Sequence, residues 1–347
     1  MMPDREIRFG IIGSGMVARY HAAGIAATPG TKLAAVCVSQ PARAAQAVAD
    51  FGVACETSLA ALLARSDIDV VSICTPSGLH AAQAIAAAQA GKHVLVEKPI
   101  ALTLADTDAM IAACHSAEVQ LGVALQRRTD PGLRQIAEAI GSGALGKPVL
   151  GTVNIPYLRT AAYYASAEWR GTWALDGGGA LMNQGIHLID LLLWYFGDVA
   201  EIYARMATQV HTIEVEDSLT ATLRFANGAL GSIVATTAAA PGYPHRVEIY
   251  GERGGVQIEG EQVLRWGIDG ITPLAQASEL AGAGAGASPT GISTAGHTRI
   301  IADMADAVRT GRTPLVGGAE GRRSLALVLA AYQSARSGVS VAPDSGR

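Results

Sequence analysis

The first 125 residues alternate short, continuously apolar runs with longer segments in which alanine and polar residues follow a helical period. The apolar runs, which predict strands, cover residues 7–12, 32–38, 70–74, 93–96 and 120–125. The intervening segments predict helices over residues 15–27, 42–51, 79–90 and 104–116. Apolar strands separated by helices are typical of a parallel sheet covered on both faces. We therefore expect a doubly wound α/β domain, with ligands beyond the carboxyl ends of its strands.

Beyond residue 126 the pattern changes to successive strands with few helices between them. Helices are predicted over residues 131–140 and 179–195, with a strand over 149–156 between them. Further strands are predicted over residues 202–209, 218–225, 230–237, 246–251, 256–260 and 263–268. Asn227-Gly228, between two of these strands, is a hairpin signal. This pattern predicts an α+β domain on a largely antiparallel sheet.

The predicted organisation is therefore two domains, residues 1–126 and 127–347, with the last helices packing back toward the first domain. These last helices are predicted over residues 299–310 and 318–337. The segment before them, residues 281–291, is rich in Gly, Ala, Ser and Pro and predicts a loop. Both an ordered lid and a disordered segment fit that composition.

Composition narrows the class of protein. Of 347 residues half are hydrophobic, and 26 Lys and Arg against 30 Asp and Glu give a net charge of -4. That balance argues against a nucleic-acid-binding protein. No apolar run reaches the ~18 residues of a membrane helix, and the N-terminus lacks the order of a signal peptide. We expect a cytoplasmic protein whose four cysteines, far apart and without zinc spacing, stay reduced and bind no metal.

A glycine-rich turn follows the first predicted strand and opens a helix. Its sequence, Gly13-Ser14-Gly15-Met16-Val17-Ala18, is a G-x-G-x-x-A form of the dinucleotide-binding fingerprint of Rossmann domains. Gly13 permits the tight turn, Gly15 leaves room for the pyrophosphate, and Ala18 allows close packing of helix and strand. Backbone N–H groups at the helix start, including that of Met16, then meet the phosphates.

The end of the second predicted strand bears on the choice of nucleotide. NAD-binding domains usually carry an Asp or Glu there, which binds the ribose 2′-hydroxyl. Here the strand ends in Val38-Ser39-Gln40, without a carboxylate. Ser39 can donate a hydrogen bond to a 2′-phosphate and Arg43 can supply positive charge. The cofactor is therefore predicted to be NAD(P), with the balance toward NADP, although Arg43 as a solvated helix residue is also compatible with NAD.

Three further motifs follow strands or open a helix. Thr75-Pro76 to His80 follows the strand at 70–74, Glu97-Lys98-Pro99 follows the strand at 93–96, and a run from Gly177-Gly178-Gly179 through His187 to Asp190 opens the long helix. Together with the fingerprint they resemble the Gfo/Idh/MocA oxidoreductases, the glucose–fructose oxidoreductase and inositol dehydrogenase family. The resemblance covers nearly the whole chain and extends to residues 307–314. It implies a Rossmann domain, a nicotinamide cofactor and a sugar or polyol substrate.

The resemblance also assigns roles to the residues of these motifs. The lysine of the Glu-Lys-Pro motif and the histidine of the helix motif flank the reacting hydroxyl in that family, which places Lys98 and His187 there. Oxidation of an alcohol removes a hydride, which the cofactor takes, and a proton, which the protein must accept. His187 suits the role of general acid and base, and Lys98 that of stabilising negative charge on oxygen. Thr75, Pro76, His80 and Glu97 are assigned to the cofactor.

One position departs from the common family pattern. Many members carry Asp four residues before the histidine, where this chain has Asn183. Residues four apart share a helix face, so Asn183 is expected to point with His187 toward the site. An amide cannot act as a base, so Asn183 is expected to orient the substrate. Relatives with Asn here include nucleotide-sugar 3-dehydrogenases, which counts against a simple inositol dehydrogenase. Asp190 either orients His187 or packs the helix.

Further candidates rest on their positions alone. Gln126 and Arg127 end the last strand of the first domain, where family members often reach the nicotinamide or the substrate. Aromatic and guanidinium groups, which suit sugars and anionic substituents, precede the glycine run. Those taken as substrate-binding candidates are Tyr157, Arg159, Trp169 and Arg170. His297 opens the penultimate helix and is a further pocket candidate.

The expected protein is an NAD(P)-dependent oxidoreductase that transfers a hydride between nicotinamide and a secondary hydroxyl of a sugar or polyol. C3 of a pyranose, in a nucleotide sugar or a glycoside, is one candidate position. An NAD-dependent glycosidase that oxidises its substrate transiently is an alternative, as is a non-catalytic NAD(P)-binding regulator. The presence of both Lys98 and His187 counts against the regulator. By family analogy we expect a homo-oligomer, a dimer or tetramer, built on the exposed face of the second sheet.

Overall fold

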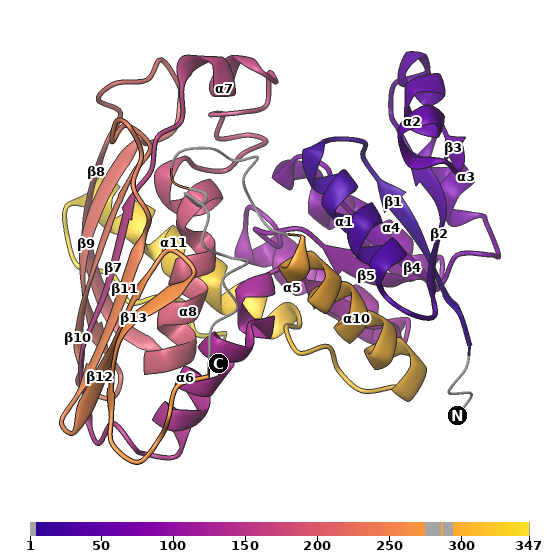
Figure 1. Cartoon of the computed structure of the whole chain (residues 1–347). Helices are drawn as coiled ribbons and strands as arrows, with labels where there is room; N and C mark the ends of the chain where they lie inside the picture. The colour runs from indigo at the N-terminus through magenta and orange to yellow at the C-terminus, as the bar shows by residue number, and fades with distance from the viewer. Residues whose placement is uncertain (1–4, 275–285, 287–293, 347) are drawn as a thin grey trace. The chain divides into compact units, whose positions relative to one another are not determined.

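A computed structural model of the chain describes residues 5–274, 286 and 294–346 (Figure 1). It divides into two compact units. Unit 1 comprises Met1–Thr129 and Thr294–Arg322, and unit 2 comprises Asp130–Ser293 and Arg323–Arg347. The loop predicted over residues 281–291 lies, apart from Gly286, outside the described residues.

Unit 1 is built on a six-stranded sheet in which every strand pair is parallel. Its strands are β1 (Ile7–Ile12), β2 (Thr31–Cys37), β3 (Ala54–Glu56), β4 (Val70–Ile73), β5 (His93–Val96) and β6 (Leu121–Val123). They lie in the order β3-β2-β1-β4-β5-β6. The chain runs outward from β1 in one direction and then, from β4, in the other. The doubly wound topology is therefore confirmed, and the reversal between β1 and β4 marks the ligand-binding crevice of such sheets.

Helices connect successive strands of this sheet and pack against it. The helices are α1 (Met16–Ala27), α2 (Ala44–Phe51), α3 (Leu59–Leu63), α4 (His80–Gln89), α5 (Leu104–Ser116) and α10 (Ala295–Thr310), with 3₁₀ turns η1 (Pro41–Arg43), η2 (Ser77–Leu79) and η3 (Gln126–Thr129). Figure 1 shows α10 alongside α1, and α4 packs against α5. The strands bury apolar side chains on both faces, as the sequence predicts for a covered parallel sheet.

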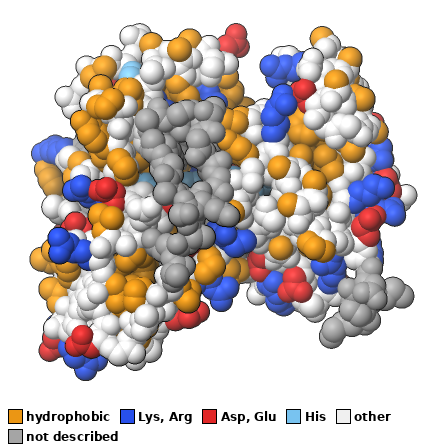
Figure 2. All heavy atoms as spheres, in the orientation of Figure 1, with side chains coloured by type: hydrophobic (Ala, Val, Ile, Leu, Met, Phe, Trp, Pro, Cys, Tyr) orange, Lys and Arg blue, Asp and Glu red, His pale blue; other side chains and the backbone are white. Residues whose placement is uncertain are grey.

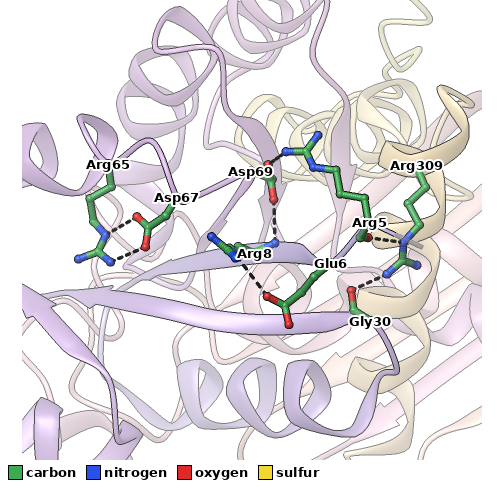
Figure 3. Close-up of polar contacts among 8 residues, drawn as sticks. All are labelled: Arg5, Glu6, Arg8, Gly30, Arg65, Asp67, Asp69 and Arg309. Atoms are coloured by element: carbon green, nitrogen blue, oxygen red, sulfur yellow. Dashed lines mark hydrogen bonds and ion pairs between the residues drawn. The ribbon is translucent and has the colours of Figure 1, made fainter. Parts of the chain in front are cut away.

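Charged side chains collect near the starts of the strands of unit 1 (Figure 3). Arg5 pairs with Asp69, which also accepts a hydrogen bond of 2.9 Å from the backbone N–H of Arg8. Arg309 of α10 donates to the carbonyl oxygens of Arg5 (3.2 Å) and Gly30 (2.5 Å). These contacts attach α10 at the amino end of β1, the edge of the sheet opposite to that where ligands bind.

Unit 2 contains a seven-stranded sheet in the order β13-β12-β11-β7-β10-β9-β8. The strands are β7 (Pro148–Pro156), β8 (Val199–Ala207), β9 (Ser218–Phe225), β10 (Leu230–Thr236), β11 (Arg246–Gly251), β12 (Gly254–Glu259) and β13 (Gln262–Ile268). Only β7 and β10 pair in parallel. The largely antiparallel sheet and the Asn227-Gly228 hairpin are confirmed: Gly228, at φ +90°, joins β9 to β10.

Helices cover one face of this second sheet, where α8 (Ile186–Phe196) packs against β7 and β11. The other helices of unit 2 are α6 (Pro131–Gly141), which packs against α8, the short α7 (Ala161–Ala165), and α11 (Gly318–Ser337), which begins in unit 1 and continues in unit 2. Figure 1 shows α8 and α11 running along the sheet, and Ser334 of α11 accepts a hydrogen bond of 3.0 Å from the backbone N–H of Ala204 in β8. Exposed and buried residues alternate along β9 and β10, as in a sheet with one covered face.

The single helix predicted over residues 179–195 is wrong in its first part. The chain forms a π-helical turn, η4 (Ala180–Gly185), before α8 begins. Backbone N–H groups of Gly179 and Leu181 donate to the Glu216 carboxylate at 2.9 and 2.8 Å, and that of Met182 donates to the Tyr332 hydroxyl. Side chains from elsewhere in unit 2 thus satisfy donors that a regular helix start leaves open.

The surface carries charges of both signs. Figure 2 shows acidic and basic side chains interspersed on the viewed face of each unit, without a broad basic patch there. Among the described residues, no helix has the length and apolar character needed to cross a bilayer.

Candidate active site

The glycine-rich turn lies between β1 and α1, as predicted. Gly13 has φ +105°, and a Cβ there would lie 2.6 Å from the carbonyl oxygen of Cys74, so only glycine fits. A Cβ on Gly15, by contrast, would meet no atom of the protein within 4 Å. Ala18 is fully buried. The open space above Gly15, at the start of α1, fits the pyrophosphate of a dinucleotide.

The end of β2 exposes the two residues considered for the 2′-position of the ribose. Ser39 and Arg43 are both exposed. The neighbouring strand β3 places Glu56 beside Cys37, a carboxylate that the sequence analysis missed because β3 was not predicted. Glu56 forms an ion pair with Arg65 at 3.1 Å. Ser39 and Arg43 are thus available at this edge to bind a 2′-phosphate. The nearby Glu56 carboxylate is already paired with Arg65.

His80 connects two loops at the carboxyl edge of the sheet. Its Nδ1 lies 2.8 Å from the carbonyl oxygen of Pro99 and its Nε2 lies 3.0 Å from that of Thr75. Burial lowers the pKa of His80, even though both hydrogen bonds favour the charged ring. The loop that carries Thr75 and Pro76 after β4 is thereby fixed to the loop that carries Lys98 and Pro99 after β5.

Glu97, at the end of β5, lies in a buried cluster with two histidines. Its Oε1 lies 2.8 Å from His21 Nε2 and 3.7 Å from His297 Nε2, and all three residues are less than 10% exposed. Ser72 Oγ lies 2.7 Å from the other ring nitrogen of His21. Among the described residues these three form the one group of His, Cys, Asp or Glu side chains close enough to hold a metal ion.

Hydrogen bonding alone satisfies the pair His21–Glu97. A carboxylate only accepts, so we assign the proton of His21 to Nε2, and Ser72 then donates to Nδ1. Burial opposes the charge of Glu97, but the contacts with His21 and His297 outweigh it and hold the pKa of Glu97 well below its usual range. Burial likewise lowers the pKa of His21. The cluster therefore holds an ionised Glu97 against a neutral His21.

Lys98 is half-buried, and its backbone N–H donates to Glu97 Oε2 at 3.2 Å. Gln126 begins η3, next to the start of α10, where a Cβ on Gly296 would lie 2.9 Å from its Cγ. In the described residues neither Gln126 Oε1 nor His297 Nδ1, both buried, has a hydrogen-bond partner. A buried acceptor of this kind near the strand ends fits a site completed by a bound polar group. Arg127, the next residue, is half-buried.

In unit 2, η4 and the first turn of α8 present the second set of candidates. Asn183 lies in η4 and His187 is the second residue of α8, and both are half-buried. Asn183 Nδ2 donates to the buried carboxylate of Asp176. Asp190 accepts a hydrogen bond of 2.9 Å from Ser324 of α11, which attaches α8 to α11.

The residues before the glycine run form an aromatic and cationic group. Arg159 is 2% exposed, and its guanidinium carbon lies 5.2 and 5.6 Å from the ring centres of Tyr157 and Tyr163. Arg170 stacks on Tyr163 (4.2 Å) and on Trp169 (4.6 Å). Tyr157 is buried, with its hydroxyl 2.8 Å from His245. Stacking on aromatic rings fixes both guanidinium groups.

The candidates therefore divide between the two units. Gly13, Gly15, Thr75, Glu97 and Lys98 follow β1, β4 and β5, whose carboxyl ends lie at one edge of the parallel sheet of unit 1. Met16, Pro76 and His80 belong to the same strand ends, whereas Asn183, His187 and the residues Tyr157 to Arg170 belong to unit 2.

Sequence reasoning also missed three residues that contact the candidates or their partners, namely His21, Ser72 and Asp176. His21 lies on the buried face of α1 and Ser72 inside β4, positions that any packed residue takes. Asp176 lies seven residues before Asn183 in a segment without regular structure. No local pattern marks any of the three, because their roles come from the partners that folding gives them.

Comparison with known proteins covers most of the chain. Residues 7–125 match the family model described as "Oxidoreductase family, NAD-binding Rossmann fold", and residues 133–257 match that of the "GFO/IDH/MocA C-terminal domain". D-apiose dehydrogenase of Paraburkholderia graminis is 30% identical over 97% of this chain and 90% of its own length. Levoglucosan dehydrogenase of Pseudarthrobacter phenanthrenivorans is 30% identical over 67% of this chain and 68% of its own.

A solved structure is similar over almost the full length. The WlbA dehydrogenase from Bordetella pertussis, in complex with NADH and UDP-GlcNAcA, is 36% identical, with 99% of each chain covered and a TM-score of 0.88. The similarity therefore extends through both units.

Proposed function

The chain belongs to the GFO/IDH/MocA family of NAD-binding sugar and polyol oxidoreductases, and from that premise we propose that it oxidises a nucleotide-linked sugar at a secondary hydroxyl. The favoured position is C3 of a pyranose. The observation that carries this substrate class is the 36% identity, over 99% of both chains, to a dehydrogenase solved with NADH and UDP-GlcNAcA. Asn183 before His187, in place of the common Asp, agrees with it.

The cofactor supplies the hydride acceptor when it is bound. Gly13 and Gly15 provide the turn and the space for its pyrophosphate, and the first N–H groups of α1, beginning at Met16, donate to the phosphates. Thr75, Pro76, Glu97 and Gln126 lie at the strand ends beyond that turn and complete the cofactor side of the site. His80 acts through the backbone of the two loops that it connects.

The roles of the reacting groups follow from their chemistry. Lys98 stabilises the negative charge that develops on the substrate oxygen, and His187 accepts the hydroxyl proton. Asn183 orients the substrate. The residues that provide the stacking and charge suited to a phosphorylated or carboxylated sugar are Arg127, Tyr157, Arg159, Trp169 and Arg170.

A fluorescence titration of the purified protein with NADH and NADPH is the first test, after a check for cofactor retained through purification. Reversible binding is expected. Absorbance assays with UDP-GlcNAcA, with UDP-GlcNAc as the matched neutral sugar, and with levoglucosan and D-apiose then test the substrate class. We expect UDP-linked sugars to be oxidised. Oxidation of the free sugars alone contradicts the proposal, and cofactor that arrives bound and does not exchange favours transient oxidation with internal regeneration.

We further propose that the site accepts NADP as well as NAD, with Ser39 and Arg43 facing the 2′-position. No carboxylate ends β2, and the nearby Glu56 is paired with Arg65. If Arg43 pairs with a 2′-phosphate, Arg43→Ala should weaken NADPH binding about fivefold and leave NADH binding unchanged, since an exposed charge pair is worth roughly 1 kcal/mol. Equal effects on the two nucleotides contradict this assignment.

A further inference from the structure

A chain of hydrogen bonds runs through η4, the turn that directly precedes His187. Arg159 Nε and Nη2 donate to Gln184 Oε1 at 3.0 and 2.7 Å. Gln184 Nε2 donates to Asn183 Oδ1 at 3.0 Å, and Asn183 Nδ2 donates to Asp176 Oδ1. The other oxygen of Asp176 accepts the backbone N–H of Gly171 at 2.9 Å. All these residues belong to unit 2.

The residues at the two ends of this series of hydrogen bonds determine which groups donate and which accept. A guanidinium group only donates hydrogen bonds and a carboxylate only accepts them. Arg159 and Asp176 are both 2% exposed, so water cannot easily replace either end. Each amide between them therefore has one favourable orientation. Gln184 is further fixed because Nε2 also donates to the Tyr163 hydroxyl at 3.1 Å.

A carboxylate at position 183 would conflict with this arrangement. An aspartate there would face the Asp176 carboxylate at hydrogen-bond distance with no proton between them, and two carboxylates so close cannot both stay ionised. The position that carries Asp in many members of the family must here carry an amide, because the carboxylate stands at residue 176. Asn183 is thus the partner of Asp176, rather than an isolated change at the substrate site.

We propose that Asp176 and Gln184 are positioning residues that hold the Asn183 amide in one orientation, and that this orientation determines how Asn183 meets the substrate. The carbonyl side of the amide is directed toward Gln184 and the NH₂ side toward Asp176. This inference rests on the proposed function only for the role of Asn183 in substrate binding. The orientation itself follows from the hydrogen-bond chain.

Exchange of the two side chains is the test. Asn183→Asp should lower turnover at neutral pH at least tenfold relative to the unaltered protein, and lowering the pH should narrow this difference, because a protonated carboxyl group at position 183 can again donate to Asp176 while protonation of His187 affects both proteins alike. Asp176→Asn should lower kcat/KM about tenfold, mainly through a raised KM, because Asn183 loses its fixed acceptor. In the double variant Asp176→Asn/Asn183→Asp, residue 176 can accept from Gly171 and donate to residue 183, so the double variant should exceed Asn183→Asp in both turnover and stability.

The matched control is Asn227→Asp in the β9–β10 hairpin, whose amide donates to the carbonyl oxygen of Phe196 and not to a carboxylate. It should keep the pH dependence of turnover of the unaltered protein. Turnover is measured with UDP-GlcNAcA, and the free energy of unfolding of the unaltered protein and of every variant is measured by urea titration. Additive effects in the double variant, or an Asn183→Asp protein without recovery at low pH, overturn the inference. Failure to oxidise UDP-GlcNAcA overturns the proposed substrate instead, and the unfolding measurements, with their own pH dependence, still decide whether residues 176 and 183 are coupled.

Discussion

The backbone of Lys98 is held in place by the residue that precedes it. Its N–H donates to Glu97, whose carboxylate is buried against His21, so the loop after β5 has little freedom to move. If the Lys98 ammonium lies beside the developing oxyanion, as proposed, it stabilises the transition state. Lys98→Ala should therefore lower turnover about 10² to 10³-fold while NADH binding, measured by fluorescence, changes little.

A buried lysine elsewhere in unit 1 provides the control for that prediction. Lys92 precedes β5 at the opposite edge of the sheet, and its Nζ donates to the carbonyl oxygens of Arg65 (2.7 Å) and Ile68 (2.9 Å). Lys92→Ala should lower the free energy of unfolding without changing turnover per folded molecule. If the two variants behave alike, Lys98 has only a structural role.

Glu97 makes stability depend on pH in a defined direction. Contacts with His21 and His297 hold its pKa well below the usual range, so its contribution is complete above the unfolded value of about 4.3 and is lost as the pH falls through the folded value. Glu97→Gln should destabilise the protein by about 1 to 3 kcal/mol at pH 7, and less at acid pH. Urea unfolding at several pH values measures the difference, and a constant difference contradicts an ionised Glu97.

At the scale of elements, a substitution in the turn between β1 and α1 can weaken cofactor binding without affecting folding. Gly15 has ordinary helix-start geometry at φ -76°, and a Cβ there would meet nothing within 4 Å. Gly15→Ala should therefore leave the free energy of unfolding unchanged but weaken NADH binding at least tenfold, because the methyl group occupies space that the pyrophosphate needs. Thermal unfolding and fluorescence titration measure the two effects. Unchanged binding contradicts the placement of the phosphates.

The length of a helix or strand determines whether its sequence pattern is long enough to predict it. Strands such as β1 and β5 and helices such as α5 are found at their predicted bounds, because apolar runs and helical periods are local signals. The strand β3 and the helices α3 and α7 were missed because three to five residues are too few to show a period. The turn η4 has the apolar content of a helix, and the Glu216 and Tyr332 side chains that bind its N–H groups are distant in sequence.

The same reasoning applies to the candidate site. The fingerprint and the Glu-Lys-Pro motif are contiguous, so the sequence alone marks Gly13, Gly15 and Lys98 as candidates. Asp176 and His21 acquire their partners only through tertiary packing, and no spacing rule predicts which amide a buried carboxylate will bind. Residues that position others are thus harder to find from sequence than residues that form a motif.

At the scale of the whole molecule, the outer face of the sheet in unit 2 exposes paired apolar residues. Leu150 of β7 lies opposite Leu230 of β10, and they are 37% and 56% exposed. Val234, four residues along β10 on the same face, is 43% exposed. Neighbouring exposed apolar side chains on a sheet are typical of an interface. We propose that a second copy of the chain covers this face.

Light scattering with size-exclusion chromatography tests that proposal. The unaltered protein should elute as a dimer or tetramer at micromolar concentration, and Leu230→Arg should shift it toward the monomer, because a charge at the centre of an apolar contact loses its hydration without gaining a partner. Val210→Arg is the matched control, since Val210 is 68% exposed and belongs to the loop between β8 and β9 rather than to a strand. A monomeric unaltered protein, or an equal response of the two variants, contradicts an interface on this face.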